Sequence, residues 1–248
     1  MNPIKIRFLL TGRCTATCAY CHNEGQSKPA PMLSLSAIRH VLETLRRNRI
    51  PLQEIVLSGG EPTLHKELGS IAALCAQSGV PLSLNSHGGH PDRLQDALPY
   101  LHEFKLHLDS FDPDQQFTSM GIALHKVWES IALAQSYPTI RILTNHPVQS
   151  WEETRRFVQN AHAARIDCKL IDLLNDTTDA LSGDQLPWHE EGYLRTDAAT
   201  WQHRDTHHQI HTRQCDGKRD RSSNTLFIGA DGVRRFLNGP VLGRAENF

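Results

Sequence analysis

Three cysteines lie within eight residues near the start of the sequence, at Cys14, Cys18 and Cys21. Thiolates are ligands for zinc and for iron–sulfur clusters. A structural zinc site needs a fourth ligand, and His22 is badly placed to bind the same metal ion as its neighbour Cys21. The alternative is a [4Fe–4S] cluster held through three of its irons, with the fourth iron open for a reacting ligand. Three thiolates at this spacing favour the open cluster.

Composition and charge exclude several other classes of protein. The 248 residues include 26 Lys and Arg against 27 Asp and Glu, for a formal net charge of −1, so no global basic field attracts nucleic acid or acidic membranes. The opening MNPIKIRFLLTG is too short and too polar for a secretory signal or a membrane span. We therefore expect a cytoplasmic protein whose cysteines stay reduced. Cys75 and Cys168 fit buried core positions, which leaves Cys215 as the remaining thiol.

Strand-like and helix-like segments alternate through the first two thirds of the chain. The six predicted strands are 4–10, 54–59, 81–86, 103–110, 140–145 and 168–174. The five predicted helices between them are 34–48, 66–79, 91–101, 121–135 and 150–164. Ser34 or Ser36 is the expected cap of the first helix, and Ser150 with Glu153 makes a capping box for the last. Repeated βαβ units predict a parallel sheet of an α/β barrel or partial barrel, with its chemistry at the carboxyl ends of the strands.

The last part of the chain has a different character, so we expect a barrel over residues 1–175 and an extension over 176–248 that caps it. NTLFIGADGVRRFL predicts a β-hairpin that turns at Asp231-Gly232. His203, His207 and His211 are spaced four residues apart, and a helix would place them on one face. That spacing permits a metal site, but a solvated helix face is the favoured interpretation.

Two motifs together resemble the signatures of the radical S-adenosylmethionine (SAM) enzymes. The first is Cys-x3-Cys-x2-Cys after a first strand, with an aromatic residue before the third cysteine. The second is Gly59-Gly60-Glu61-Pro62 within LSGGEPTL, at the end of the second strand. The resemblance covers about residues 4–175. It implies a (βα)6 partial TIM barrel, one [4Fe–4S] cluster on Cys14, Cys18 and Cys21, and SAM bound to the open iron.

The same resemblance implies which residues contact the cofactors. In the family the GGEP segment takes the SAM amino group through backbone carbonyls, often with the glutamate, and glycine allows close approach of the backbone. Polar residues at the ends of the third to fifth strands contact the ribose and carboxylate. The implied contacts are Tyr20, His22, Gly59, Gly60, Glu61, Pro62, Ser83, Asn85, Ser86, Asp109, Ser110, Thr144 and Asn145.

Within the family the sequence is most similar to the GTP cyclases of molybdenum cofactor synthesis. Arg7 occupies the place of a phosphate-binding arginine, and FIGADGVRRFL resembles their C-terminal hairpin. Those enzymes carry three further cysteines for a second cluster, where this sequence has Asp220, Ser223 and Leu237. A second cluster is therefore not expected. Candidates for substrate contact or catalysis are Arg7, Lys105, His107, Arg141, Lys169, Asp172 and Cys215.

The expected activity is reductive cleavage of SAM to a 5′-deoxyadenosyl radical that abstracts hydrogen from a small molecule, such as a nucleotide or sugar intermediate in a biosynthetic pathway. The partners implied are a reductant such as flavodoxin or ferredoxin, with no nucleic acid and no membrane. One alternative is a radical SAM maturase of a ribosomal peptide. Alternatives of other classes are a non-catalytic iron–sulfur protein for electron transfer or redox sensing, and a zinc-stabilised binding module.

Overall fold

The strands of the sheet follow the predicted βα alternation. The computed structural model describes residues 2–19, 21, 32–148, 150–173, 182–215, 224–234, 242–243 and 245. The six predicted strands are present as β1 (Ile4–Leu9), β2 (Leu52–Ser58), β3 (Leu82–Ser86), β4 (Glu103–His107), β5 (Arg141–Pro147) and β6 (Asp167–Leu173). Five more strands follow them: β7 (Tyr193–Asp197), β8 (Thr200–His203), β9 (Gln209–Cys215), β10 (Thr225–Gly229) and β11 (Gly232–Arg234).

The helices begin where the sequence supplies caps. Ser34 accepts the Ala37 N–H at the start of α1, and Ser150 accepts the Glu153 N–H at the start of α6. The α-helices are α1 (Leu35–Arg47), α2 (Leu68–Ala76), α3 (Pro91–Leu94), α4 (Pro113–Met120), α5 (Leu124–Gln135) and α6 (Trp151–Ala163). The 3₁₀ turns are η2 (Pro62–Leu64), η3 (Leu98–Tyr100), η4 (Gly183–Gln185) and η5 (Trp188–Glu191). The predicted helix 91–101 was too long, since α3 and η3 divide it, and α4 was missed.

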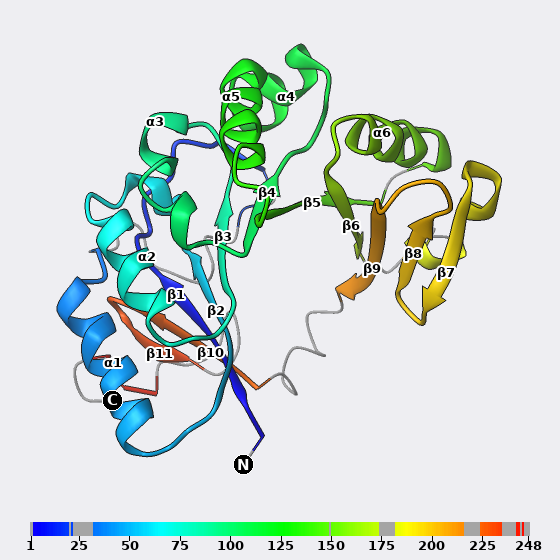
Figure 1. The fold of residues 1–248 in the computed structure, drawn as a ribbon. Coiled ribbons are helices and arrows are strands. Elements are labelled where there is room, and N and C mark those ends of the chain that lie inside the picture. Colours follow the sequence, from blue (N-terminus) through cyan, green and yellow to red (C-terminus); the bar gives the residue numbers. More distant parts are fainter. Residues whose placement is uncertain are drawn as a thin grey trace.

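One open sheet contains all of these strands, in the order β11-β10-β1-β2-β3-β4-β5-β6-β9-β8-β7. Strands β1 to β6 are parallel neighbours, β9 joins β6 in parallel, and β10 joins β1 in parallel. The C-terminal strands therefore extend both edges of the six-stranded core (Figure 1). The result is a mixed α/β fold with a mostly parallel, unclosed sheet, as predicted for a partial barrel. The proposed boundary at residue 175 stays a prediction.

Alternate side chains of each strand serve two different surfaces. Ile6 and Phe8 are fully buried in the hydrophobic core, as are Leu84 and Phe104 on neighbouring strands. Successive side chains of a strand point to opposite faces, so the residues between them face the interior of the open barrel. Cys75 and Cys168 are fully buried core residues, which confirms the prediction for both. No helix among the described residues is long and apolar enough to span a membrane.

The C-terminal segment differs from the sequence-based prediction in two places. His203 lies in β8 and His211 in β9, with His207 between these strands, so the predicted helical face of histidines is wrong. The hairpin is confirmed as β10 and β11, but Gly229 pairs with Gly232 and the turn therefore falls on Ala230 and Asp231. Strand β8 is antiparallel to both β7 and β9.

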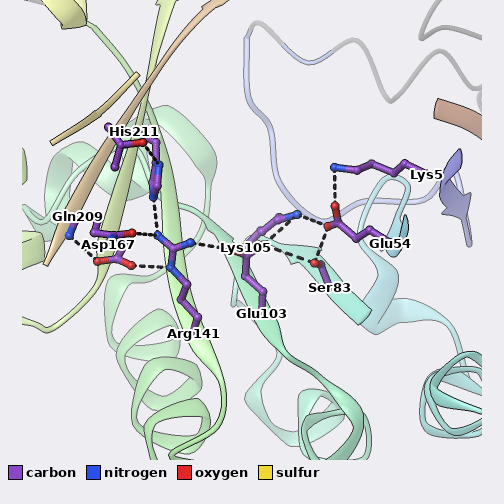
Figure 2. Close-up of polar contacts among 10 residues, drawn as sticks. Lys5, Glu54, Ser83, Glu103, Lys105, Arg141, Asp167, Gln209 and His211 are labelled. Atoms are coloured by element: carbon purple, nitrogen blue, oxygen red, sulfur yellow. Dashed lines mark hydrogen bonds and ion pairs between the residues drawn. The ribbon is translucent and has the colours of Figure 1, made fainter. Parts of the chain in front are cut away.

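A row of polar side chains, here named the floor belt, crosses the interior face near the amino ends of the strands (Figure 2). Its members are Lys5, Glu54, Ser83, Glu103, Lys105, Arg141, Asp167, Gln209 and His211. Lys105 Nζ lies 2.7 Å from Glu54 and 2.9 Å from Glu103. Arg141 Nε donates to Asp167 at 2.6 Å. Three cations meet three anions, so the belt balances its own charge.

Arg141 also links the core strands to β9. It donates to Gln209 Oε1 at 3.0 Å and contacts His211 Nε2, while Asp167 accepts the Gln209 N–H at 2.7 Å. Arginine only donates, so His211 Nε2 is an acceptor and the ring is neutral, with its Nδ1–H directed to Thr200. Burial, followed by the Arg141 charge, lowers the pKa of His211 and favours this neutral form. The belt therefore joins the C-terminal strands to the barrel.

We expect Glu54→Gln to destabilise the protein by about 2 kcal/mol at pH 7, because Lys5 and Lys105 would lose a half-buried anionic partner. Burial opposes ionisation, but the two lysines outweigh it and lower the pKa of Glu54 from 4.5 to about 2. Glu54 therefore contributes stability above pH 4.5, and this contribution is lost as the pH falls through about 2.

Urea unfolding at pH 7 and at pH 3 measures both effects. The difference in unfolding free energy between wild type and Glu54→Gln should be smaller at pH 3 than at pH 7. The matched control is Glu129→Gln, whose partner Lys126 is exposed, with an expected change below about 0.5 kcal/mol. Equal destabilisation by both substitutions would contradict a structural role for the belt.

Candidate functional site

The three motif cysteines lie on the loop that follows β1, at the carboxyl edge of the sheet. Cys14 and Cys18 are half-buried and Cys21 is exposed. The Ala16 N–H donates to Cys14 Sγ at 3.3 Å, and the Thr17 N–H donates to Met120 O at 2.9 Å. Burial, then the Asp109 charge and the other two thiols, raises the pKa of Cys18 to about 11. Binding of metal would therefore displace a proton from this thiol.

The donor set fits an iron–sulfur cluster better than a single metal ion. Among the described residues, no three His, Cys, Asp or Glu side chains are gathered closely enough to share one ion. In a cubane each thiolate binds a different iron, so the sulfurs need not converge on one point. The three cysteines share one loop, and Cys14 and Cys21 raise the pKa of Cys18 through their charge. Thiols placed in this way fit the ligands around a cluster.

The glycines of the GGEP segment are required by the backbone of the cysteine loop. The Gly60 N–H donates to Thr11 O at 2.6 Å, and the Glu61 N–H donates to Arg13 O at 2.8 Å. A Cβ on Gly60 would lie 2.2 Å from the Arg13 carbonyl oxygen. Gly59 has φ +137°, and its Cβ would lie 2.5 Å from Thr11 O. The two signature segments are therefore packed backbone to backbone, a contact that the sequence motifs did not predict.

The Glu61 carboxylate is fully buried and holds this edge together. Its Oε1 accepts the Thr63 N–H, the Thr63 hydroxyl and the Ser86 hydroxyl, at 3.0, 2.7 and 2.8 Å. Its Oε2 accepts the His87 N–H at 3.0 Å and lies 3.2 Å from His87 Nε2. Pro62 begins the buried turn η2. The side chains of Glu61 and Ser86 thus join the β2 and β3 loops, while their contact with SAM stays a prediction.

Three residues that sequence reasoning missed connect this edge to the cysteine loop. Thr15 Oγ1 lies 3.1 Å from His87 Nε2 and 2.9 Å from His90 Nε2. His87 is 4% exposed, whereas Thr15 is exposed. The signal in the sequence was SHGGH directly after the third strand, two histidines flanking a pair of glycines.

Several predicted residues share the interior face above the floor belt. His107, Asn145 and Lys169 are register partners on β4, β5 and β6, so they form one row. Asn85 lies on the same face, in register with Lys105, and its buried Oδ1 has no hydrogen-bond partner among the described residues. Arg7 lies on β1 with its guanidinium 5.7 Å from the centre of the Phe227 ring. This row presents donors and acceptors to the interior.

The loop after β4 is ordered by one buried glutamine. Gln116 Oε1 accepts the N–H groups of Asp109 and Ser110, at 3.0 and 3.1 Å. His107 Nε2 lies 3.5 Å from Asp109 Oδ1. The Ser110 hydroxyl donates to Gln115 at 2.9 Å. Asp109 raises the pKa of Cys18 through its charge, which places this carboxylate near the cysteine loop.

Other predicted residues already have structural partners or face away from the interior. Ser83, Lys105 and Arg141 belong to the floor belt, at the opposite end of the strands from the cysteines. Asp172 accepts the Ser182 hydroxyl and the Gly183 N–H, both at 2.7 Å. Thr144 is fully buried and pairs in register with the core residue Leu106, so its side chain lies on the helix-covered face. Its predicted cofactor contact stays a prediction.

Tyr20 and His22 lie outside the described residues, and so does the side chain of Cys215, which ends β9. Their predicted roles stay predictions.

Comparison with known proteins decides the family. Residues 8–180 match the model of the Radical SAM superfamily, which is more than half of the chain. The chain belongs to the radical SAM superfamily. Membership implies SAM cleavage with an iron–sulfur cluster, in agreement with the donor set of the cysteine loop.

Curated relatives of this radical SAM chain include GTP 3′,8-cyclases. It is 36% identical to that of Synechococcus elongatus over 115 residues, covering 43% of this chain and 34% of the relative. It is 28% identical to a probable GTP 3′,8-cyclase of Sulfolobus acidocaldarius over 171 residues, covering 65% of this chain and 53% of the relative. The radical SAM chain thus spans only a third to a half of these relatives.

Solved structures of other radical SAM enzymes share the fold. Streptococcus suis SuiB bound to its precursor peptide SuiA has a TM-score of 0.56 at 17% identity, covering 68% of this chain and 39% of that one. SuiB has also been solved bound to S-adenosylmethionine. At this identity the likeness shows the fold alone.

Proposed function

We propose that this radical SAM chain holds one [4Fe–4S] cluster through Cys14, Cys18 and Cys21 and cleaves SAM to act on a small polar molecule inside the barrel. When bound and reduced, these cofactors supply a 5′-deoxyadenosyl radical that removes a hydrogen atom from the substrate. The observation that carries the proposal is the packing of the cysteine loop onto Gly60 and Glu61, which brings both signature segments to one edge.

The chain's own residues would bind and orient at this edge. The segment Gly59 to Pro62 runs in contact with residues 11–13, so its backbone carbonyls are suited to accept the SAM amino group. Asn85 and Ser86 lie at the end of β3, beside this segment. The buried Oδ1 of Asn85 has no hydrogen-bond donor among the described residues, so a bound ligand could donate to it. Asp109 and Ser110 are fixed by Gln116 on the next loop. These residues are our proposed cofactor contacts.

The substrate would meet the row His107, Asn145 and Lys169, with Arg7 beside it on β1. Imidazole, amide, ammonium and guanidinium groups match a polar or anionic small molecule, such as a nucleotide or sugar intermediate. The relatives named GTP 3′,8-cyclase support a nucleotide. The sequence positions of their second cluster hold Asp220, Ser223 and Leu237, which speaks against the same cyclisation.

Peptide modification is the second candidate, because the SuiB structure contains a precursor peptide. SuiB is similar to this chain in fold, whereas the two GTP 3′,8-cyclases described above share 28% and 36% of their aligned sequence with it. We therefore favour the small molecule. The electron donor is proposed to be a flavodoxin or ferredoxin, and the location cytoplasmic, where thiols stay reduced.

Anaerobic reconstitution with iron and sulfide tests the proposal. We expect a brown protein with about four irons per chain that converts SAM to methionine and 5′-deoxyadenosine when dithionite is added. Chromatographic measurement of 5′-deoxyadenosine is the readout. A stable cluster without SAM cleavage would instead favour an electron-transfer or sensing protein, and a colourless zinc protein would favour a binding module.

Cys215→Ala tests whether a second cluster exists. We expect the reconstituted variant to keep about four irons per chain, because one thiolate cannot hold another cubane. Iron and acid-labile sulfide analysis of wild type and variant provides the comparison. A wild type with about eight irons per chain that falls to about four in the variant would revive the second cluster and with it the cyclase reaction.

A further inference from the structure

A polar chain runs from Glu61 through His87 to Thr15 and links the cysteine loop to the loop after β3. The components are separated widely in sequence, since Thr15 and His87 are 72 residues apart. Thr15 sits between two predicted cluster ligands, Cys14 and Cys18. Glu61 belongs to the segment that we propose to bind SAM.

The hydrogen bonds fix the tautomer of His87. Its Nδ1 accepts the Gly89 N–H at 3.0 Å, and a backbone N–H can only donate. The ring proton is therefore on Nε2, which lies 3.2 Å from Glu61 Oε2 and 3.1 Å from Thr15 Oγ1. A second proton on Nδ1 would face the Gly89 N–H. Burial, the largest influence, lowers the pKa of His87 and agrees with a neutral ring.

Glu61 keeps the imidazole in place. Its carboxylate is 0% exposed and accepts hydrogen bonds from Thr63, Ser86 and the His87 backbone. A buried carboxylate with this many donors has a single orientation, so the adjacent imidazole has one as well. The single Nε2–H of His87 is shared between Glu61 Oε2 and Thr15 Oγ1, and the Thr15 hydroxyl can donate its own hydrogen to His90 Nε2, 2.9 Å away.

We propose that His87 and Thr15 are positioning residues that hold the cysteine loop at a fixed place relative to the GGEP edge. The inference rests on the proposed cluster and SAM sites. Neither residue contacts the reacting atoms in this scheme. Their hydrogen bond limits the freedom of the loop that carries Cys14 and Cys18, so that a cluster held there would resist loss of iron and would stay close to the proposed SAM edge.

Two substitutions, each of which removes one partner, test the hydrogen bond between Thr15 and His87. Thr15→Val removes the hydroxyl from an exposed loop position and should not disturb folding, while His87→Leu removes the other partner. We expect each to increase the rate of iron loss to EDTA about tenfold in the anaerobically reconstituted protein, the usual size of an effect on groups that orient metal ligands. Titration calorimetry should also show weaker SAM binding by Thr15→Val.

Conservative variants and a matched control separate positioning from general damage. Thr15→Ser keeps the hydroxyl, and His87→Gln keeps an N–H donor at the Nε2 position, so both should restore iron retention to within about threefold of wild type. Thr17→Val makes the same substitution on the same loop and keeps the hydrogen bond of Thr17, which its backbone N–H donates to Met120 O, so this variant should behave as wild type. The double variant Thr15→Val/His87→Leu should lose iron no faster than the worse single variant.

Either of two results would overturn this inference and leave the proposed function intact. One is a Thr15→Val variant that loses iron to EDTA as slowly as wild type, and the other is fully additive effects in the double variant. If His87→Leu fails to fold, Thr15→Val and Thr15→Ser decide the question. A wild-type protein that takes up no cluster would instead overturn the proposed function, and the inference with it.

Discussion

Alanine at Cys14, Cys18 or Cys21 is expected to reduce SAM cleavage to background in the reconstituted protein. In the proposed cluster each thiolate would bind its own iron, so two remaining thiolates would leave two irons without protein ligands and the cubane would not be retained. Iron analysis, the absorbance near about 400 nm and 5′-deoxyadenosine formation should fall together. The loop is half-buried to exposed, so the apo-protein should keep its melting temperature within a few degrees.

Cys75→Ala is the matched control for these variants. Cys75 is a fully buried residue of α2, and burial raises the pKa of its thiol to about 12. We expect a stability loss of about 1 kcal/mol with iron content and SAM cleavage unchanged. Retained cluster and retained cleavage in any of the three loop variants would refute the cluster assignment.

Gly60→Ala is expected to have the second largest effect, although glycine carries no functional group. The added Cβ would lie 2.2 Å from the Arg13 carbonyl oxygen, and the Gly60–Thr11 and Glu61–Arg13 backbone hydrogen bonds would have to break to make room. We expect a loss of stability of about 3 kcal/mol or more. SAM cleavage per folded molecule should fall at least tenfold, because the added Cβ would push the cysteine loop away from the GGEP segment that we propose to bind SAM.

The control for Gly60→Ala is Gly243→Ala, where no atom of the described residues lies within 4 Å of the added Cβ. That variant should match wild type in both urea unfolding and SAM cleavage. Wild-type stability and activity in Gly60→Ala would show that the two signature segments are not packed as described.

The sequence was sufficient for features that depend on local pattern. Hydrophobic periodicity located β1 to β6, and side-chain caps located the starts of α1 and α6 at Ser34 and Ser150. It failed for β7 to β9 because these strands lack a clear alternation; four of the five residues of β7 are exposed. Regular spacing of His203, His207 and His211 then imitated a helix.

The sequence did not reveal which face of the sheet the polar residues at the ends of the strands occupy. Thr144 and Asn145 are adjacent polar residues on β5, yet one is buried under helices and the other lines the interior, because side chains alternate. Lys105 and Arg141 remain predicted substrate candidates, and their anionic partners in the floor belt could not be read from the sequence. Thr15 and His87 meet only through tertiary structure, so no local pattern could pair them.

The placement of β10 beside β1 governs how this chain acquires its structure during synthesis. Lys5 pairs with Thr225 and Leu9 with Gly229, so this edge of β1 stays unpaired until residues 225–229 have been made. An unpaired strand edge is a template for pairing with other chains, and such long-range closure is slow. The nascent protein should therefore depend on chaperones until the hairpin of β10 and β11 pairs with β1.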